Sequence, residues 1–80
     1  MATYRDGSDV GLLDFTTGPL ADGRVVVGEV LDIMSDSVFL VGYELAEETG
    51  TAHSPRYRVR HGVGRGDPAE FGLVVRLPPG

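Results

Sequence analysis

The sequence has 80 residues, a net charge of −5 and no cysteine. A chain of this length forms one domain with a thin hydrophobic core, and the missing cysteines exclude a disulfide framework and a thiolate metal site. The negative charge disfavours a protein built mainly to grip nucleic acid, because such proteins are basic. The core must therefore suffice alone, or contacts with another subunit must add to its stability.

The sequence carries no predicted membrane or export signal. No apolar run reaches the roughly 18–20 residues of a membrane-spanning helix, and the N-terminal residues MATYRDGS lack a secretory hydrophobic segment. All seven basic residues are arginine and lysine is absent, which is typical of GC-rich bacterial or bacteriophage genomes. We expect a cytoplasmic or virion location, with no secretion by a signal peptide and no membrane partner.

The first part of the chain predicts an arm, a strand and a turn. Residues 1–8 are polar and are expected to form an N-terminal arm. Residues 9–16 follow as a first strand, and a turn over 17–23 contains the breaker pairs Gly-Pro and Asp-Gly.

The middle of the chain predicts two apolar strands. Residues 24–33 are rich in β-branched side chains, and Gly28 within them indicates a bulge or bend. Residues 38–44 form a second apolar strand that also contains a glycine, Gly42. The acidic segment 44–50 fits one or two helical turns ended by Gly50 and fits an acidic loop equally well.

Residues 55–61 predict a fourth strand by strict alternation. Tyr57, Val59 and His61 are expected to face inward, and the arginines at 56, 58 and 60 are expected to form a solvated outer face. The glycine-rich residues 62–66 then form a flexible connection.

A capped single turn precedes the last strand. Asp67 suits the N-cap, Pro68 the first helical position and Glu70 the third. Residues 71–77 form a fifth strand. The predicted core comprises Val25, Val27, Val30, Leu31, Val38, Leu40, Phe71, Leu73 and Val75.

These elements indicate an all-β fold in one domain over residues 9–80. Five strands joined by short turns, with one helical turn before the last strand, are typical of a small SH3-like barrel. A helix between the third and fourth strands would instead indicate an OB-like barrel, and the segment 44–50 keeps that alternative open.

The candidate site residues predict binding rather than catalysis. Arginine side chains recur at every second residue, so a protein contact, a phosphate backbone or the protein's own acids all suit them. The acidic cluster of Glu44, Glu47 and Glu48 is one such acceptor, in this copy or in a neighbouring one. The expected partner-binding residues are Arg56, Arg58, Arg60, Arg65, Tyr4 and Arg5.

We expect no enzyme, no bound metal and no cofactor. His53 and His61 are the two histidines, and their spacing suits neither a ligand pair nor a base beside a nucleophile.

The run PLADGRVVVGEVL, residues 19–31, resembles the start of a bacterial polymorphic-toxin immunity family with a small β-barrel. The matching positions are Pro19, Leu20, Asp22, Gly23, Arg24, Gly28 and Val30. The resemblance implies a protein that acts by binding another protein, and it supplies no catalytic residues. In its acidic composition, length and lack of cysteine, the chain also resembles small bacteriophage capsid decoration and virion proteins.

The sequence therefore predicts a non-catalytic protein-binding or assembly module. It is expected to dock onto a larger bacterial or phage assembly, or onto copies of itself, through strand edges, its N-terminal arm and an arginine face. A toxin-neutralising binding protein of the immunity type is the alternative. A nucleic-acid-binding barrel that uses Arg56, Arg58 and Arg60 is the second alternative, which the net charge disfavours.

Overall fold

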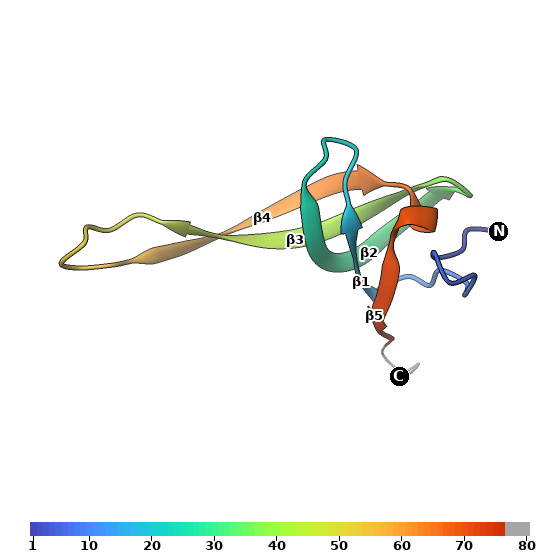
Figure 1. Cartoon of the computed structure of the whole chain (residues 1–80), viewed down its shortest axis with the longest axis horizontal. Coiled ribbons are helices and arrows are strands. Elements are labelled where there is room, and N and C mark those ends of the chain that lie inside the picture. Colours follow the sequence, from blue (N-terminus) through green and yellow to red (C-terminus); the bar gives the residue numbers. More distant parts are fainter. Residues whose placement is uncertain (77–80) are drawn as a thin grey trace.

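The fold is a five-stranded antiparallel sheet with almost no helix, seen in a computed structural model that describes residues 1–76 (Figure 1). The prediction of an all-β chain is confirmed. The strand order is β4-β3-β2-β1-β5, and the sheet is not closed. The elements are β1 (Phe15–Pro19), β2 (Val25–Ser35), β3 (Val38–Glu48), β4 (Tyr57–Gly66), a short 3₁₀ turn η1 (Pro68–Glu70) and β5 (Gly72–Val75).

The first strand begins later than residue 9. A turn occupies the residues before it, in which Asp14 N–H donates to the Gly11 carbonyl and Leu13 has a φ of 68°. The predicted turn over 17–23 is correspondingly shorter. It is closed by Gly23 N–H donating to the Leu20 carbonyl, and Gly23 adopts a φ of +89°.

The predicted core is right at Val30 and Phe71, which are fully buried, but elsewhere β2 and β3 use the opposite alternation from the one predicted. Val26 and Val30 of β2 and Phe39 and Val41 of β3 are buried, together with Ala2, Tyr4, Leu20 and Phe71. The predicted core residues Val25, Val27, Leu31 and Val75 are exposed, whereas Val38, Leu40 and Leu73 are half-buried. Runs of consecutive apolar residues fit either alternation, so the sequence does not decide which set faces inward. Leu77, at the end of the predicted last strand, lies outside the described residues.

Residues 1–8 pack against the sheet and do not form a free arm. Ala2 and Tyr4 are buried, and Thr3 forms a β-bridge with Asp9. Arg5 N–H donates to the Phe71 carbonyl at 2.9 Å, which joins this segment to the chain just before β5.

The β3–β4 hairpin extends far beyond the core. β3 pairs with β2 only as far as Tyr43, which lies opposite Gly28, but it pairs with β4 as far as Glu48 opposite Tyr57. Residues 44–61, which we call the ribbon, therefore project as two strands and a tip (Figure 1). They give the molecule its long axis, with extents of 50 × 31 × 19 Å.

The structure corrects two predictions within this hairpin. Residues 44–48 are strand, so the helix that an OB-like barrel would carry at 44–50 is absent from this described segment. Residues 62–66 are also strand rather than a flexible connection.

Three glycines at alternate positions of β4 make room for large side chains. A Cβ at Gly62 would lie 2.6 Å from the Tyr43 ring, one at Gly64 2.6 Å from Leu20, and one at Gly66 2.5 Å from Phe71. The glycine-rich sequence is thus explained by rings and aliphatic groups that lie directly over the strand.

The predicted capped turn before β5 is confirmed. Asp67 accepts a hydrogen bond from Ala69 N–H at 3.0 Å, and Pro68 occupies the start of η1. Among residues 1–76, none of the helical segments has the length and apolar character needed to cross a bilayer.

Candidate protein-binding surface

The two faces of the ribbon carry different side chains. Paired residues of an antiparallel ladder share a face, so Arg60 lies beside Leu45, and Arg58 beside Glu47, on what we call the arginine face. Val59 lies beside Ala46 on the opposite face, which we call the outer face; it also carries Glu44, Glu48, Tyr57 and His61.

This arrangement corrects the predicted orientation of β4. The arginine face continues the side of the sheet on which Val41 is buried opposite Gly64, whereas Tyr57, Val59 and His61 point away from the core side. All residues from 56 to 61 are nevertheless exposed, because the ribbon has left the core behind. Within the ribbon, β4 residues on the core side of the sheet are therefore exposed, as are those on the outer face.

Glu47 of the same hairpin partly neutralises the positive charge of the arginine face. Arg58 Nη2 lies 3.0 Å from Glu47 Oε2, and Arg60 Nη1 lies 3.8 Å from the same oxygen. One carboxylate therefore serves two guanidinium groups, whose side chains remain 64% and 65% exposed. Exposed pairs of this kind contribute little to stability, on the order of 0–1 kcal/mol. Most of the N–H donors of both arginines stay available to another molecule.

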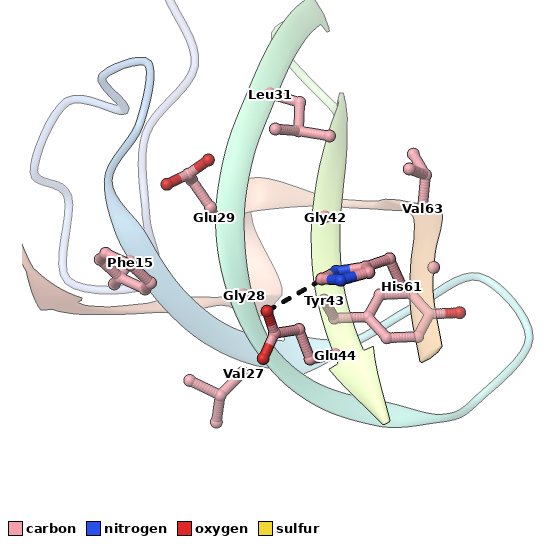
Figure 2. Close-up of a pocket in the computed structure, with 11 residues that line it drawn as sticks. Phe15, Val27, Gly28, Glu29, Leu31, Gly42, Tyr43, Glu44, His61 and Val63 are labelled. Atoms are coloured by element: carbon pink, nitrogen blue, oxygen red, sulfur yellow. Dashed lines mark ion pairs between the residues drawn. The ribbon is translucent and has the colours of Figure 1, made fainter. Parts of the chain in front are cut away.

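A shallow apolar groove lies on the outer side of the sheet, next to the base of the ribbon (Figure 2). It has a volume of about 600 Å³, and its apolar lining includes Phe15, Val27, Leu31 and Val63. Glu29, Glu44 and His61 add polar groups to the lining, and His61 Nδ1 lies 3.6 Å from Glu44 Oε1. The groove is open to solvent, and two of its apolar residues, Val27 and Leu31, are ones that the sequence wrongly placed in the core.

The groove owes its shape to the bend of β2 at Gly28. A Cβ at this position would lie 2.3 Å from the carbonyl oxygen of Gly42, so only glycine permits this approach of β2 to β3. β2 curves past Gly28, as the sequence predicts (Figure 2), but there is no bulge there, because Gly28 pairs in register with Thr16 and Tyr43. The register shifts in β2 come later, after Val30 and after Ile33.

The structure separates the predicted site residues into several places. Arg58 and Arg60 share the arginine face, and Arg56 lies at the tip, where its carbonyl accepts from Thr49 N–H. Arg65 belongs to the other side of β4 by alternation. Arg5 lies beside β5, the strand at the opposite edge of the sheet from β4.

Tyr4 is a correction to the predicted partner-binding set. Its side chain is only 2% exposed, and its hydroxyl donates to Asp14 Oδ2 at 2.8 Å inside the protein. A residue buried in this way has no side-chain surface to offer a partner.

Tyr4 belongs to a buried polar cluster around Asp14 that the sequence does not reveal. Asp14 is 2% exposed and accepts from the Tyr4 hydroxyl, from Gly11 N–H at 2.8 Å and from Arg76. Arg76 approaches side-on, with Nε 3.0 Å from Oδ1 and Nη2 3.0 Å from Oδ2, and it also donates to the Asp9 carbonyl. The cluster ties the N-terminal segment to the chain after β5.

These contacts shift two pKa values in opposite directions. Burial disfavours the Asp14 carboxylate, but hydrogen bonds from Arg76, Tyr4 and Gly11 outweigh it and hold the pKa of Asp14 below its ordinary value. Burial and the nearby Asp14 carboxylate raise the pKa of the Tyr4 hydroxyl. Both shifts are those of a structural ion pair and a buried phenol.

The histidines do not assemble a reactive site. His53 lies in the exposed tip of the ribbon, and His61 is exposed beside Glu44. Within residues 1–76, no three histidine or carboxylate side chains lie close enough together to hold a metal ion.

Comparisons of this chain with protein-family models, with curated proteins and with solved structures found no significant match.

Proposed function

We propose that this protein is a non-catalytic binding module that docks onto a larger bacterial or phage assembly as a structural subunit. The observation that carries this proposal is the ribbon, which projects from the sheet with both faces exposed (Figure 1). Its cross-strand register is continuous from the core to the tip, so it is a formed element rather than a loose loop.

The ribbon should be more stable when a partner covers its outer face. An isolated two-stranded hairpin is marginally stable in water, and the outer face leaves Tyr57 and Val59 69% and 55% exposed. Burial of these two side chains and of Val63 by a partner would stabilise the ribbon by removing apolar surface from water. The groove at its base would extend the same contact.

We further propose that the sheet is an incompletely closed SH3-like barrel. Support comes from the strand order, from η1 immediately before β5, and from a single bridge between Leu20 after β1 and Gly66 at the end of β4. Ala21 N–H also donates to the Arg65 carbonyl at 2.8 Å. These contacts bring the end of β1 against the end of β4.

The alternatives use the same ribbon with less support. A toxin-neutralising partner would bind the same outer face, and its case rests on the resemblance of residues 19–31. Nucleic-acid binding would need an unneutralised row of arginines with interleaved aromatic groups. Glu47 partly neutralises Arg58 and Arg60, and Tyr57 lies on the other face.

Shortening the ribbon tests the proposal. Residues 46–59 are replaced by Asn-Gly, which joins Leu45 to Arg60 across a directly paired position with a two-residue turn. We expect the shortened chain to keep its sheet and to lose its partner. The measurement is capture of proteins from a lysate of the encoding host on immobilised full-length and shortened chains, together with the mass of each chain in solution.

Circular dichroism and the thermal midpoint serve as the control for folding. A protein captured by the full-length chain and lost by the folded, shortened chain supports the proposal. Equal capture by both chains, or a full-length chain that is strictly monomeric and captures nothing, contradicts it.

A further inference from the structure

The free edge of β4 is the feature that says most about the partner. Antiparallel strands direct the backbone groups of alternate residues toward alternate neighbours. Arg56 accepts from Thr49 in the tip, so the even-numbered residues of β4 face β3. Arg65 accepts from Ala21 outside the β3–β4 pair, so the odd-numbered residues face the other way.

Four residues thereby present unpaired backbone groups along one edge. They are Tyr57, Val59, His61 and Val63, and within residues 1–76 their N–H and C=O groups take part in no hydrogen bond on that side. The carbonyl of Arg65, the next odd-numbered residue, already accepts a hydrogen bond from Ala21 N–H. No proline interrupts residues 57–66, so each of the four residues offers both a donor and an acceptor.

The side chains beside this edge favour an added strand that carries acidic residues. A strand added to β4 would pair directly with Tyr57, Val59, His61 and Val63 through the backbone. Arg58 and Arg60 would then occupy the intervening positions, where opposing side chains approach most closely. Acidic side chains two residues apart on the added strand would therefore meet both guanidinium groups. The residues between them would lie on the outer face beside Val59, where apolar side chains fit.

A second copy of this chain is a poor occupant of the edge. Two-fold pairing of β4 strands centred on Arg60 sets Arg60 against Arg60, and pairing centred on Val59 sets Arg58 against Arg60; like charges directly opposite are destabilising. Pairing centred on His61 sets Arg60 against Gly62 and Arg58 against Gly64, so it places no acid opposite either guanidinium group. Side-by-side copies with parallel ribbons would pair β4 with the acidic β3 of the neighbour. That arrangement spaces the copies by two strands, about 10 Å, whereas the molecule is 19 Å across even in its shortest direction.

We propose that the free edge of β4 binds an extended segment of a partner protein as an additional antiparallel strand. The segment alternates acidic residues, opposite Arg58 and Arg60, with β-branched or other apolar residues that pack beside Val59. Backbone hydrogen bonds supply most of the affinity, and the two arginines supply selectivity. The inference rests on the proposed function and names the surface and the partner chemistry.

The experiment titrates two blocked peptides of about nine residues, a typical strand length, into the ¹⁵N-labelled protein. One alternates glutamate with valine, and the other alternates lysine with valine. We expect the glutamate peptide to bind at least about tenfold more tightly at 50 mM salt, to shift the amides of Tyr57, Val59, His61 and Val63, and to slow their hydrogen exchange. High salt should reduce the preference.

Two matched substitutions separate backbone pairing from surface contact. Val59→Pro removes an N–H that faces the free edge and leaves the β3–β4 ladder intact, so peptide binding should be lost. Val59→Thr retains the N–H and should bind. Arg60→Glu should reverse the preference toward the lysine peptide.

The proposal is overturned if neither peptide perturbs the edge amides, if the lysine peptide binds as well as the glutamate peptide, or if Val59→Pro binds normally. Capture of a partner that the ribbon-shortened chain loses, combined with any of these results, would retain the binding function and reject strand addition.

Discussion

Replacing Asp14 with asparagine is expected to lower the free energy of unfolding by about 3 kcal/mol at pH 7. The carboxylate is 2% exposed and holds the Tyr4 hydroxyl, Gly11 N–H and two donors of Arg76. An amide carries no charge and offers one acceptor oxygen, so it cannot satisfy these donors together. Urea denaturation of the two proteins measures the difference.

The same substitution should change the pH dependence of stability. Because folding lowers the pKa of Asp14, its contribution is complete above the ordinary carboxyl pKa of about 3.9 and is lost as the pH falls through the lower folded value. The wild type should therefore lose stability below about pH 4, and the Asp14→Asn protein should lose less. Asp32→Asn, at an exposed position without a hydrogen bond to its side chain among the described residues, is the control. Equal losses for the two variants would show that the cluster around Asp14 does not stabilise the fold.

Replacing Gly66 with alanine is expected to cost about 2–3 kcal/mol of stability. The added Cβ would lie 2.5 Å from Phe71 Cε1 and 3.2 Å from Phe39 Cε1. The Phe71 ring cannot retreat, since it is fully buried, lies over Gly18 on another strand and stacks edge-on against Phe39 with ring centroids 4.9 Å apart. The loss is read from thermal or chemical denaturation.

Gly62→Ala is the matched control on the same strand. Its Cβ would lie as close to a ring, 2.6 Å from Tyr43, but that ring is half-buried and can swing toward solvent. We expect a loss below about 1 kcal/mol, because rotation of the half-buried Tyr43 ring toward solvent relieves the contact. If both substitutions cost the same, the tight packing around Phe71 is not what requires glycine in β4.

Local chemistry predicted the parts of this fold that depend on a few neighbouring residues. The second strand, the bend at Gly28 and the turn capped by Asp67 are all confirmed. Each depends on a β-branched run, a glycine or a cap, and these act over short distances. Local chemistry did not predict which face of β2 is buried. Val25, Val26 and Val27 fit either alternation, and only packing against other strands decides which of them face the core.

The candidate surface was predictable in composition but not in arrangement. Alternation correctly placed the arginines on one face of β4 and Tyr57 and Val59 on the other. The length of the hairpin was not predictable, because the acidic residues 44–48 have low strand propensity and are held as a strand by pairing with β4. The Asp14 cluster was also hidden, since it joins Tyr4, Asp14 and Arg76 from distant parts of the sequence.

Amide hydrogen exchange along β4 of the unbound protein is the most direct measurement of the central claim, that the ribbon is a formed element whose β4 edge is open. We predict that the amides of Arg58, Arg60, Gly62 and Gly64 are protected by β3, whereas those of Tyr57, Val59, His61 and Val63 exchange rapidly. Protection of both sets would mean that something already covers the edge. Rapid exchange of both sets would mean that the ribbon does not form, and either result would contradict the account.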